Sequence, residues 1–514
     1  MSPSRNNKNS MALAAICLAS LMFGLEISSV PVALPAIGQF LHAGFEDLQW
    51  IMNGYTLACT AVLMATGALA DRYGRKRVFV TAIAAFGVAS LLCALANGAA
   101  LLVAARVVQG VAGGAMLICA LAILSQQFGE ARERGFAFAA WGTVFGIGLG
   151  FGPVIGGLIV ALAGWQWVFL VHLPLAVATL ALAYCGVEES RDPDAARLDV
   201  GGIITLSLSV LGLACSITQG AAPGASGLAT GAIALGSAAS FAAFIVIERR
   251  STQPMMDFSV FRIRRFSGAL LGSVAMNCSY WPFMIYLPIF FQGALGYGST
   301  ATGLALLAYT LPTLLLPPLG ERLARRHCAS VVIPLGLLTI GVGFLLMRLG
   351  AGQASASWLS ILPGALLAGA GLGMTNTPVS NTTTGSVPGH RAGMASGIDM
   401  SARMISLAVN ISLMGLLLLA GVTACLQRKL PGVLDPDRLR ALAGKIAVGD
   451  LAAVGTALPP ALAGQADALM RGALLQGFEW VMLYGGLGAC LLAGASYLVF
   501  GPRRATPVAA PLAR

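Results

Sequence analysis

The chain has 514 residues, of which 57% are hydrophobic and only 10% are charged, and its formal net charge is +11. A soluble domain usually carries about 25% charged residues to cover its surface, so this composition excludes an ordinary soluble protein. Net positive charge can indicate nucleic-acid binding. Here, however, the cations lie in short segments between apolar stretches, which indicates membrane topology and no nucleic-acid partner.

Apolar segments long enough to cross a bilayer recur along the whole chain, and only helices can satisfy their backbone in lipid at these lengths. The first apolar segment follows two basic residues, Arg5 and Lys8, as the apolar part of a signal peptide does. It is longer than such a part, however, and it contains Glu26, so we expect an uncleaved span. We expect about fourteen helices, in the windows 11–34, 48–70, 78–97, 101–125, 135–160, 165–187, 200–220, 228–247, 267–291, 300–319, 331–350, 357–380, 396–425 and 478–500.

The loops between these windows differ sharply in basic residues. The alternate set that includes the N-terminus holds 22 Lys and Arg, whereas the opposite set holds six, all within 426–477. The positive-inside rule therefore places both termini in the cytoplasm and 426–477 outside, in a multi-pass protein of the cell (inner) membrane. Asp435 and Pro436 resemble a helix cap followed by proline in the first turn, so we expect short helices on the outer surface.

A weak internal repeat suggests how the spans are grouped. Basic loops at 71–77 and 320–326 follow the second and the tenth window. If the seventh and eighth windows are an insert, each of these loops follows the second span of a six-span half. We expect an all-α integral membrane protein with an N-terminal six-helix bundle (1–190), two inserted transmembrane helices (191–262) and a C-terminal six-helix bundle (263–514) that contains the long outside loop 426–477. Parallel halves of this kind are typical of transporters.

Four local patterns carry most of the functional information. In chain order they are Leu25-Glu26-x-x-x-x-Pro31-Val-Ala-Leu-Pro35, Gly67-Ala-Leu-Ala-Asp71-Arg72-Tyr-Gly74-Arg75-Lys76-Arg77, Leu102-x-x-x-Arg106-x-x-Gln109-Gly110 and Gly148-x-Gly150-x-Gly152-Pro153-x-x-Gly156-Gly157. Together they resemble the major facilitator superfamily, and within it the fourteen-span drug:proton antiporters that export quaternary ammonium compounds, viologens and multiple drugs. The chain departs from that group at Glu26, where aspartate is usual, and at Gln166 and His172, where arginine and asparagine are usual.

The second pattern is a short basic loop. Gly67 and Gly74 allow a close backbone approach beside a tight turn, and Asp71 can pair with a nearby cation or with a helix N-terminus. The cations are Arg72, Arg75, Lys76 and Arg77. The resemblance implies a cytoplasmic latch that joins the two halves and stabilises one access state. The alternative is that the basic residues only fix the topology.

The glycines of the fifth window recur every four residues. Gly148, Gly152 and Gly156 form one stripe, and 142, 146 and 150 form a second, which predicts close helix packing. Pro153 can bend the span. The resemblance implies that this run, with Gly157, is the antiporter motif associated with export; ordinary tight packing is the alternative. A dinucleotide fingerprint is excluded because the run lies mid-membrane with no preceding strand.

Charged residues well inside the predicted spans are few, and such residues are functional candidates because they are costly in lipid. Asp399 and Arg403 stand four residues apart with the acid first, which predicts an ion pair near the cytoplasmic end of its span. Glu26 lies roughly 13 Å and Arg106 roughly 8 Å from the outer ends of their spans, at 1.5 Å per residue. Both can therefore line the same half of a central cavity.

A carboxyl in a cavity can exchange a proton when its surroundings change. We therefore expect Glu26 to be the proton-coupling carboxyl, tuned by Arg106 and by Gln109 one turn deeper. Two alternatives stay open, namely that Glu26 is a hydrogen-bonded packing carboxyl and that Arg106 extends to the outer interface.

The leading functional hypothesis is a proton-coupled antiporter that exports amphipathic or cationic small molecules from the cytoplasm, as in multidrug or biocide efflux. It would act as a monomer in the lipid bilayer, with a small-molecule substrate and protons as partners and the proton gradient in place of a cofactor. A dedicated exporter of a self-made metabolite or antibiotic, and a non-transporting sensor, are the alternatives. The chain has no G-x-x-x-x-G-K-[ST] and no clustered His, Cys or carboxylates, so a primary pump within this chain, an enzyme and a metal site are not expected.

Overall fold

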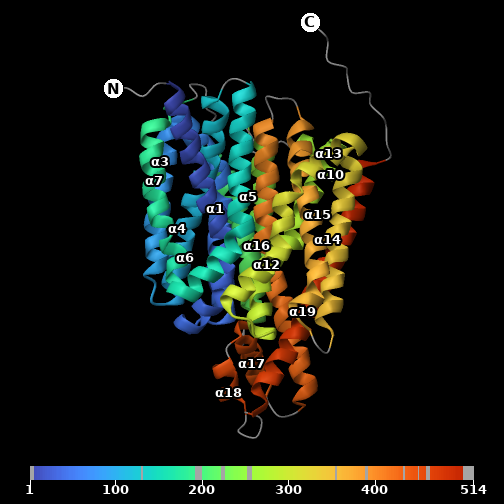
Figure 1. The fold of residues 1–514 in the computed structure, drawn as a ribbon. Coiled ribbons are helices and arrows are strands. Elements are labelled where there is room, and N and C mark those ends of the chain that lie inside the picture. The colour runs from blue at the N-terminus through green and yellow to red at the C-terminus, as the bar shows by residue number, and fades with distance from the viewer. Residues whose placement is uncertain are drawn as a thin grey trace.

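The computed structural model describes residues 5–128, 131–191, 199–220, 226–251, 258–353, 356–387, 392–431, 435–449, 451–458 and 464–501, and they form a bundle of helices with no strand (Figure 1). In this part of the chain, twelve helices are long and apolar enough to cross a membrane, or up to thirteen with one bent pair. That number does not include α2, a further helix of 29 residues. The expected count of fourteen is not confirmed and stays a prediction.

The first half of the bundle contains seven helical segments. They are α1 (Arg5–Leu41), α2 (Phe45–Tyr73), α3 (Arg75–Ala94), α4 (Ala99–Gln127), α5 (Ala131–Ala163), α6 (Gln166–Leu170) and α7 (His172–Gly186). The helix α1 packs between α5 and α7, and α4 packs against α2 and α3. The helix α1, which carries Glu26, also contacts α4, which carries Arg106.

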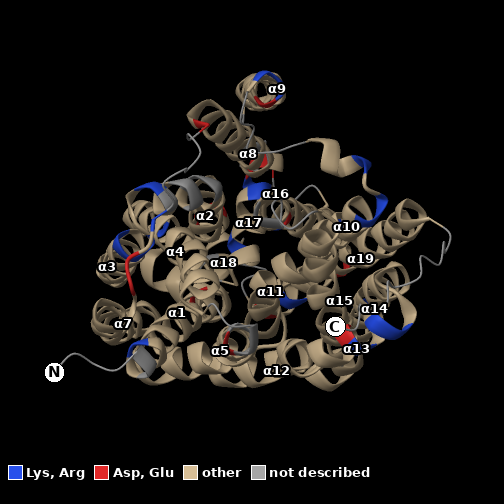
Figure 2. Ribbon diagram, turned by 90° about the horizontal axis from the view of Figure 1, so that it is seen from above, with Lys and Arg blue, Asp and Glu red and all other residues tan. Residues whose placement is uncertain are grey.

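Two helices follow the first half and pack mainly on each other. They are α8 (Val200–Gly220) and α9 (Gly227–Arg250), and α8 also packs against α2 and α16. Figure 2 shows α9 outermost, on the far side of α8 from the rest of the bundle. The Ser412 hydroxyl of α16 accepts hydrogen bonds from Thr218 of α8 at 3.0 Å and from Asn53 of α2 at 2.9 Å. The predicted boundaries 1–190, 191–262 and 263–514 themselves stay untested.

The second half contains the remaining elements. They are η1 (Phe258–Arg262), α10 (Arg264–Cys278), α11 (Tyr280–Ile289), η2 (Phe290–Ala294), α12 (Ser299–Leu315), α13 (Pro317–His327), α14 (Ala329–Ala351), α15 (Trp358–Gly385), α16 (Ala392–Lys429), α17 (Pro436–Val448), α18 (Leu451–Ala457) and α19 (Ala466–Phe500). The helices α12 and α13 meet at an angle of 45°. Pro317 has no N–H to continue the α12 hydrogen bonds, so the predicted single span 300–319 is bent there.

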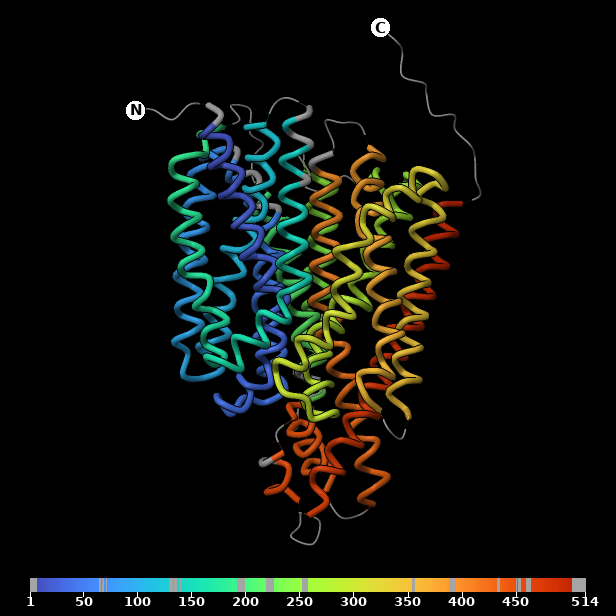
Figure 3. Tube along the Cα trace, viewed as in Figure 1, coloured from blue at the N-terminus to red at the C-terminus, as the bar shows by residue number. Residues whose placement is uncertain are grey.

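The two ends of the bundle are distinct (Figures 1 and 3). The terminal end is where α1 begins and α19 ends, and the loop end is where α17 and α18 lie. The predicted loop 426–477 is shortened because α16 continues to Lys429 and α19 begins at Ala466. Nor does α17 merely rest on the surface, since its amphipathic stripe, including Leu439, Leu442 and Ile446, is buried and packs against α2, α16 and α19.

The two halves are joined at the loop end. They meet through α5 and α12, α2 and α16, and α1 and α11. One buried apolar cluster runs through the second half and continues into the parts of α1 and α2 nearest the loop end, for example Leu34 and Leu48. The Gln49 amide donates to the Tyr286 hydroxyl across the same junction at 2.9 Å. The structure is therefore a conformation that is closed at the loop end.

Candidate functional site

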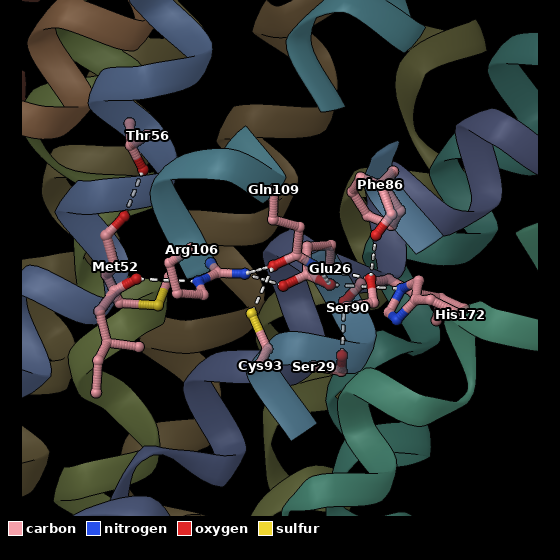
Figure 4. Close-up of polar contacts among 12 residues, drawn as sticks. Glu26, Ser29, Met52, Thr56, Phe86, Ser90, Cys93, Arg106, Gln109 and His172 are labelled. Atoms are coloured by element: carbon pink, nitrogen blue, oxygen red, sulfur yellow. Dashed lines mark hydrogen bonds and ion pairs between the residues drawn. The ribbon is translucent and has the colours of Figure 1, made fainter. Parts of the chain in front are cut away.

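Three side chains from α1 and α4 form a buried polar cluster at the centre of the first half. Glu26, Arg106 and Gln109 are each 0% exposed. The Arg106 Nη1 donates to Glu26 Oε1 and, at 2.7 Å, to Gln109 Oε1. The Gln109 Nε2 donates to Glu26 Oε2 at 2.9 Å. Both carboxylate oxygens are therefore held, and the acid and the cation neutralise each other away from water (Figure 4).

Two further side chains extend the cluster toward α3 and α7. Ser90 accepts a hydrogen bond from Gln109 Nε2 at 3.0 Å, and His172 Nε2 lies 3.6 Å from Glu26 Oε2. The sequence did not indicate either residue as part of the site. One signal was available for His172, because it is the only one of the four histidines that falls inside an apolar window.

The guanidinium of Arg106 is fixed on several sides. Its Nε donates to the Ile51 carbonyl at 3.0 Å, and its Cζ lies 4.4 Å from the centre of the Tyr55 ring and 5.8 Å from that of Phe169. Aromatic faces stabilise a cation at such distances. The side chain points into the bundle, so the alternative in which it extends to the outer interface is wrong.

A small cavity adjoins the cluster and lies between the halves. Its volume is about 30 Å³, room for one or two waters, whereas a drug-sized ligand needs several hundred Å³. Arg106 is the one charged residue among those that line it. The lining residues come from α1, α2, α4, α11 and α16: Phe23, Ile27, Met52, Tyr55, Thr56, Arg106, Trp281, Met284, Ile285, Met404 and Leu407. An aromatic and methionine lining suits apolar molecules of varied shape once the cavity widens.

One face of the glycine run in α5 packs against α1, beside the segment that carries Glu26. A Cβ added at Gly156 would lie 2.8 Å from the Ser29 carbonyl oxygen, and one at Gly152 would overlap the Ser28 hydroxyl. That hydroxyl donates to the Gly148 carbonyl at 2.9 Å. This stripe therefore sets the close packing of α1 on α5 within the first half.

A second face of the run meets α12 of the other half. A Cβ at Gly157 would lie 2.4 Å from the Ser299 carbonyl oxygen, and a Cβ at Gly303 would lie 2.6 Å from the Pro153 carbonyl oxygen. Of the other predicted stripe, Gly146 and 150 face α12, while nothing lies within 4 Å of a Cβ at 142. The run thus forms a contact between the halves as well as one inside the first half.

The basic loop between α2 and α3 contacts the segment that follows α7. Gly74 has a φ of +111°, which favours glycine, and the Glu189 carboxylate fills the space beside it. Glu189 accepts from the Lys76 backbone N–H at 3.1 Å and lies 3.8 Å from Arg77 Nε. The Lys76 Nζ donates to the Tyr184 carbonyl at 2.7 Å. Glu189 is thus an acidic partner that the sequence did not indicate.

Two further residues of the predicted latch make contacts near the loop itself. The Arg75 backbone N–H donates to the Ser190 carbonyl at 3.0 Å, and the Arg72 guanidinium lies 5.7 Å from the ring of the next residue. Gly67 lies within α2, but its surroundings and the side chain of Asp71 are outside what the structure describes. The described contacts therefore tie the loop to its own half.

The charge pair in α16 links three helices of the second half. Arg403 Nε donates to Asp399 Oδ2 at 3.1 Å, and both residues are buried. The guanidinium also donates to Asn376 at 2.5 Å and to Ser380 at 3.1 Å, both on α15, and Ser273 of α10 donates to the carboxylate. With its hydrogen-bond partners present on both sides, the pair has the geometry of a structural crosslink.

Two helical halves around a central cavity, with a paired acid and cation buried beside it, define a polytopic membrane transporter. The chain matches the Major Facilitator Superfamily over residues 16–411, and it belongs to that family. The family expected from the motifs is confirmed. The fourteen-span group within it is not confirmed and stays a prediction.

Three similar proteins carry names that refer to drug resistance, efflux or export. The chain is 32% identical to the "Multidrug resistance protein Stp" of Mycobacterium tuberculosis (strain CDC 1551 / Oshkosh), over 85% of this chain and 81% of that one. It is 29% identical to the "Tetracenomycin C resistance and export protein" of Streptomyces glaucescens, over 96% and 92%. It is also 29% identical to the "Multidrug efflux pump LfrA" of Mycolicibacterium smegmatis (strain ATCC 700084 / mc(2)155), over 88% and 89%.

Solved transporter structures share the fold at low sequence identity. A bacterial homolog of the human lysosomal transporter Spinster, in an inward-facing and unoccupied conformation, superposes with a TM-score of 0.66 at 14% identity and covers 96% of this chain and 98% of its own. A D-xylose-proton symporter gives 0.58 at 14% identity over 85% and 96%. These likenesses establish the transporter fold alone.

Proposed function

We propose that the protein is a proton-coupled antiporter that exports amphipathic or cationic small molecules from the cytoplasm. The observation that carries this proposal is that Arg106 has two kinds of contact: it pairs with the buried Glu26 carboxylate, and it also lines the central cavity. A charge change at Glu26 is therefore felt where a substrate would bind. The names of the relatives, which are drug-resistance and efflux proteins, support export as the direction.

The coupling follows from the charge of the pair. With Glu26 ionised, the pair has no net charge; with Glu26 protonated, Arg106 is uncompensated and repels a cation in the cavity. Binding of a cationic substrate then favours release of the proton, and by linkage a proton favours release of the substrate. One buried pair can thus exchange one ligand for the other, with the proton gradient as the energy source and no cofactor.

The terminal end is proposed to face the cytoplasm. Arg and Lys gather on that end of the bundle (Figure 2), at the starts of α3 and α10 and in the last turns of α9 and α13. The positive-inside rule assigns such an end to the cytoplasm. Both termini would then be cytoplasmic, α17 and α18 would be outside, and the protein would act as a monomer in the cell (inner) membrane. In this orientation the structure is closed to the outside.

The test is pH-gradient-driven transport in proteoliposomes, with a panel of cationic dyes, biocides and neutral amphipaths. Glu26→Gln keeps the shape of the side chain and removes its titration, so it is expected to abolish uphill transport and to retain downhill exchange. Glu26→Asp is expected to keep part of the coupling. Asp437→Asn, which removes an exposed carboxylate on α17, is the matched control and is expected to behave as wild type. Full coupling in Glu26→Gln would refute the role of Glu26.

A dedicated exporter of one self-made antibiotic is the second candidate. It is favoured by the tetracenomycin exporter, which matches nearly the whole of this chain. The same panel separates the two candidates, since a multidrug exporter moves several unrelated cations and a dedicated one moves a single chemical class. If wild-type protein moves none of them, the multidrug proposal is refuted, and a dedicated exporter of another chemical class or a non-transporting sensor takes its place.

A further inference from the structure

His172 is a buried titratable side chain at the start of α7. It is 0% exposed, and its ring forms a T-shaped pair with Phe86 at a centroid distance of 5.5 Å. Its Nε2 lies 3.2 Å from the Met22 carbonyl oxygen and 3.6 Å from Glu26 Oε2. Figure 4 shows the Glu26 carboxylate between Arg106 on one side and His172 on the other.

The surroundings of the ring select its neutral tautomer. A carbonyl oxygen can only accept a hydrogen bond, so the contact with Met22 requires the hydrogen to be on Nε2 of His172. The other nitrogen, Nδ1, is then a bare acceptor. It is buried and has no hydrogen-bond partner among the described residues. With Nε2 engaged by the Met22 carbonyl, Nδ1 is the ring atom whose lone pair is free to take a proton.

We propose that His172 is a second proton-binding group of the coupling site, which takes a proton on Nδ1 while Glu26 stays ionised between the imidazolium and Arg106. This inference rests on the proposed proton coupling and deepens it. The step is a simple protonation: one proton from water binds the Nδ1 lone pair, the ring becomes a cation with hydrogen on both nitrogens, and the charge of the cluster rises by one. Substrate binding reverses it and returns the proton to water.

The charges around the ring favour this reaction. In the described part of the chain, the ionisable groups of the cluster are Glu26 on α1, Tyr55 on α2, Cys93 on α3 and Arg106 on α4. The carboxylate is the nearest of them to His172 and attracts the imidazolium, whereas Arg106 is held on the far side of that carboxylate. The cluster can therefore hold a proton without breaking the pair between Glu26 and Arg106.

A packing role for His172 would need only the bond to Met22. An asparagine amide, the usual residue of the drug:proton antiporters at this position, can donate to that carbonyl and does not titrate. His172→Asn therefore separates packing from proton binding. His42→Asn is the matched control, because His42 is exposed and its φ of +50° is one that asparagine adopts readily.

The first measurement is substrate-induced proton release from detergent-purified protein between pH 5 and pH 8, the range in which histidine titrates. Wild type is expected to release about one proton more per bound substrate near the acid end of this range than His172→Asn does. The control His42→Asn is expected to match wild type. Glu26→Gln removes the carboxylate that attracts the imidazolium, so it is expected to lose the histidine-dependent part of the release as well, and adding His172→Asn to it is expected to change nothing further.

The second measurement is ¹⁵N NMR of ring-labelled histidine in wild-type protein, with the His172 signal assigned from its loss in His172→Asn or, if that variant does not fold, in His172→Gln. A ring that becomes an imidazolium on acidification and loses that proton on addition of a cationic dye supports the proposal. A ring that stays neutral down to pH 5 overturns it. If wild type releases no protons on substrate binding, and Glu26→Gln transports as wild type does, the proposed function fails instead.

Discussion

The contact of α5 with α12 offers a direct test of how this transporter opens. A Cβ at Gly157 would lie 2.4 Å from the Ser299 carbonyl oxygen, whereas ordinary contacts begin at 3.4 Å, so Gly157→Ala requires the two helices to separate by about 1 Å. Overpacking of this kind costs about 1–3 kcal/mol. Because α5 and α12 belong to different halves, that cost applies only while the loop end is closed. The ratio of open to closed molecules is therefore expected to rise by about 5- to 150-fold.

The measurement is the distance between spin labels at Leu162 on α5 and Leu304 on α12, two exposed positions near the loop end, by double electron–electron resonance. Gly157→Ala is expected to populate the longer distance. Gly156→Ala is the matched control, because its Cβ would crowd the Ser29 backbone on α1 at 2.8 Å, inside one half. That cost is equal in the open and closed states, so the control is expected to lower the melting temperature and to leave the distance distribution unchanged.

Two outcomes would refute this reasoning. If both variants change the distance distribution alike, the contact between α5 and α12 is not the one that opens. If Gly157→Ala leaves the distribution as in wild type while the protein remains folded, the helices tolerate the extra methyl group and the close approach does not control access.

Further predictions concern the other charged groups. Arg403→Met leaves Asp399 buried without its cation, which costs about 3–5 kcal/mol, so the melting temperature is expected to fall, and the double variant with Asp399→Asn is expected to recover much of the loss. Asp71→Asn is expected to slow transport and to leave the binding affinity for a fluorescent substrate unchanged; lost binding in folded protein would contradict the latch hypothesis. In a cysteine-free background, Arg440→Cys on α17 is expected to react with an impermeant maleimide added to whole cells, and reaction only after permeabilisation would reverse the topology.

The depth of a residue in a span can be predicted from the sequence, but its direction around the helix cannot. The rise per residue placed Glu26 and Arg106 at similar depths, and their side chains are in contact in the structure. Ser90 and His172 complete the cluster from α3 and α7. The rotation of those helices relative to α1 depends on packing between segments distant in the chain, which hydrophobic periodicity does not encode in a span that is apolar on all sides.

Spacings within one helix predicted contacts correctly, because they do not depend on packing between distant segments. Four residues along one helix sufficed for Asp399 and Arg403, whereas the partners on α10 and α15 lie far away in the sequence. The glycine stripes of α5 were visible, but not which stripe meets α1 and which meets α12. Likewise, the loop after α2 was evidently basic, and Glu189, its acidic neighbour, lies more than a hundred residues downstream.

The hydrogen bonds at Ser412 join α2, α8 and α16, and they make the two contacts between the halves differ in their exposure to lipid. The two halves meet along two contacts, one between α2 and α16 and one between α5 and α12. The helix α8 packs across the first of these, with α9 beyond it (Figure 2). These two helices separate the contact between α2 and α16 from the lipid, so an apolar compound dissolved in the bilayer cannot pass between α2 and α16 directly. On the side of α5 and α12, no other helix in the described part of the chain lies across the glycine-lined contact (Figure 2). If substrates enter from the membrane, we expect them to pass between α5 and α12, the same two helices whose separation is predicted to open the loop end.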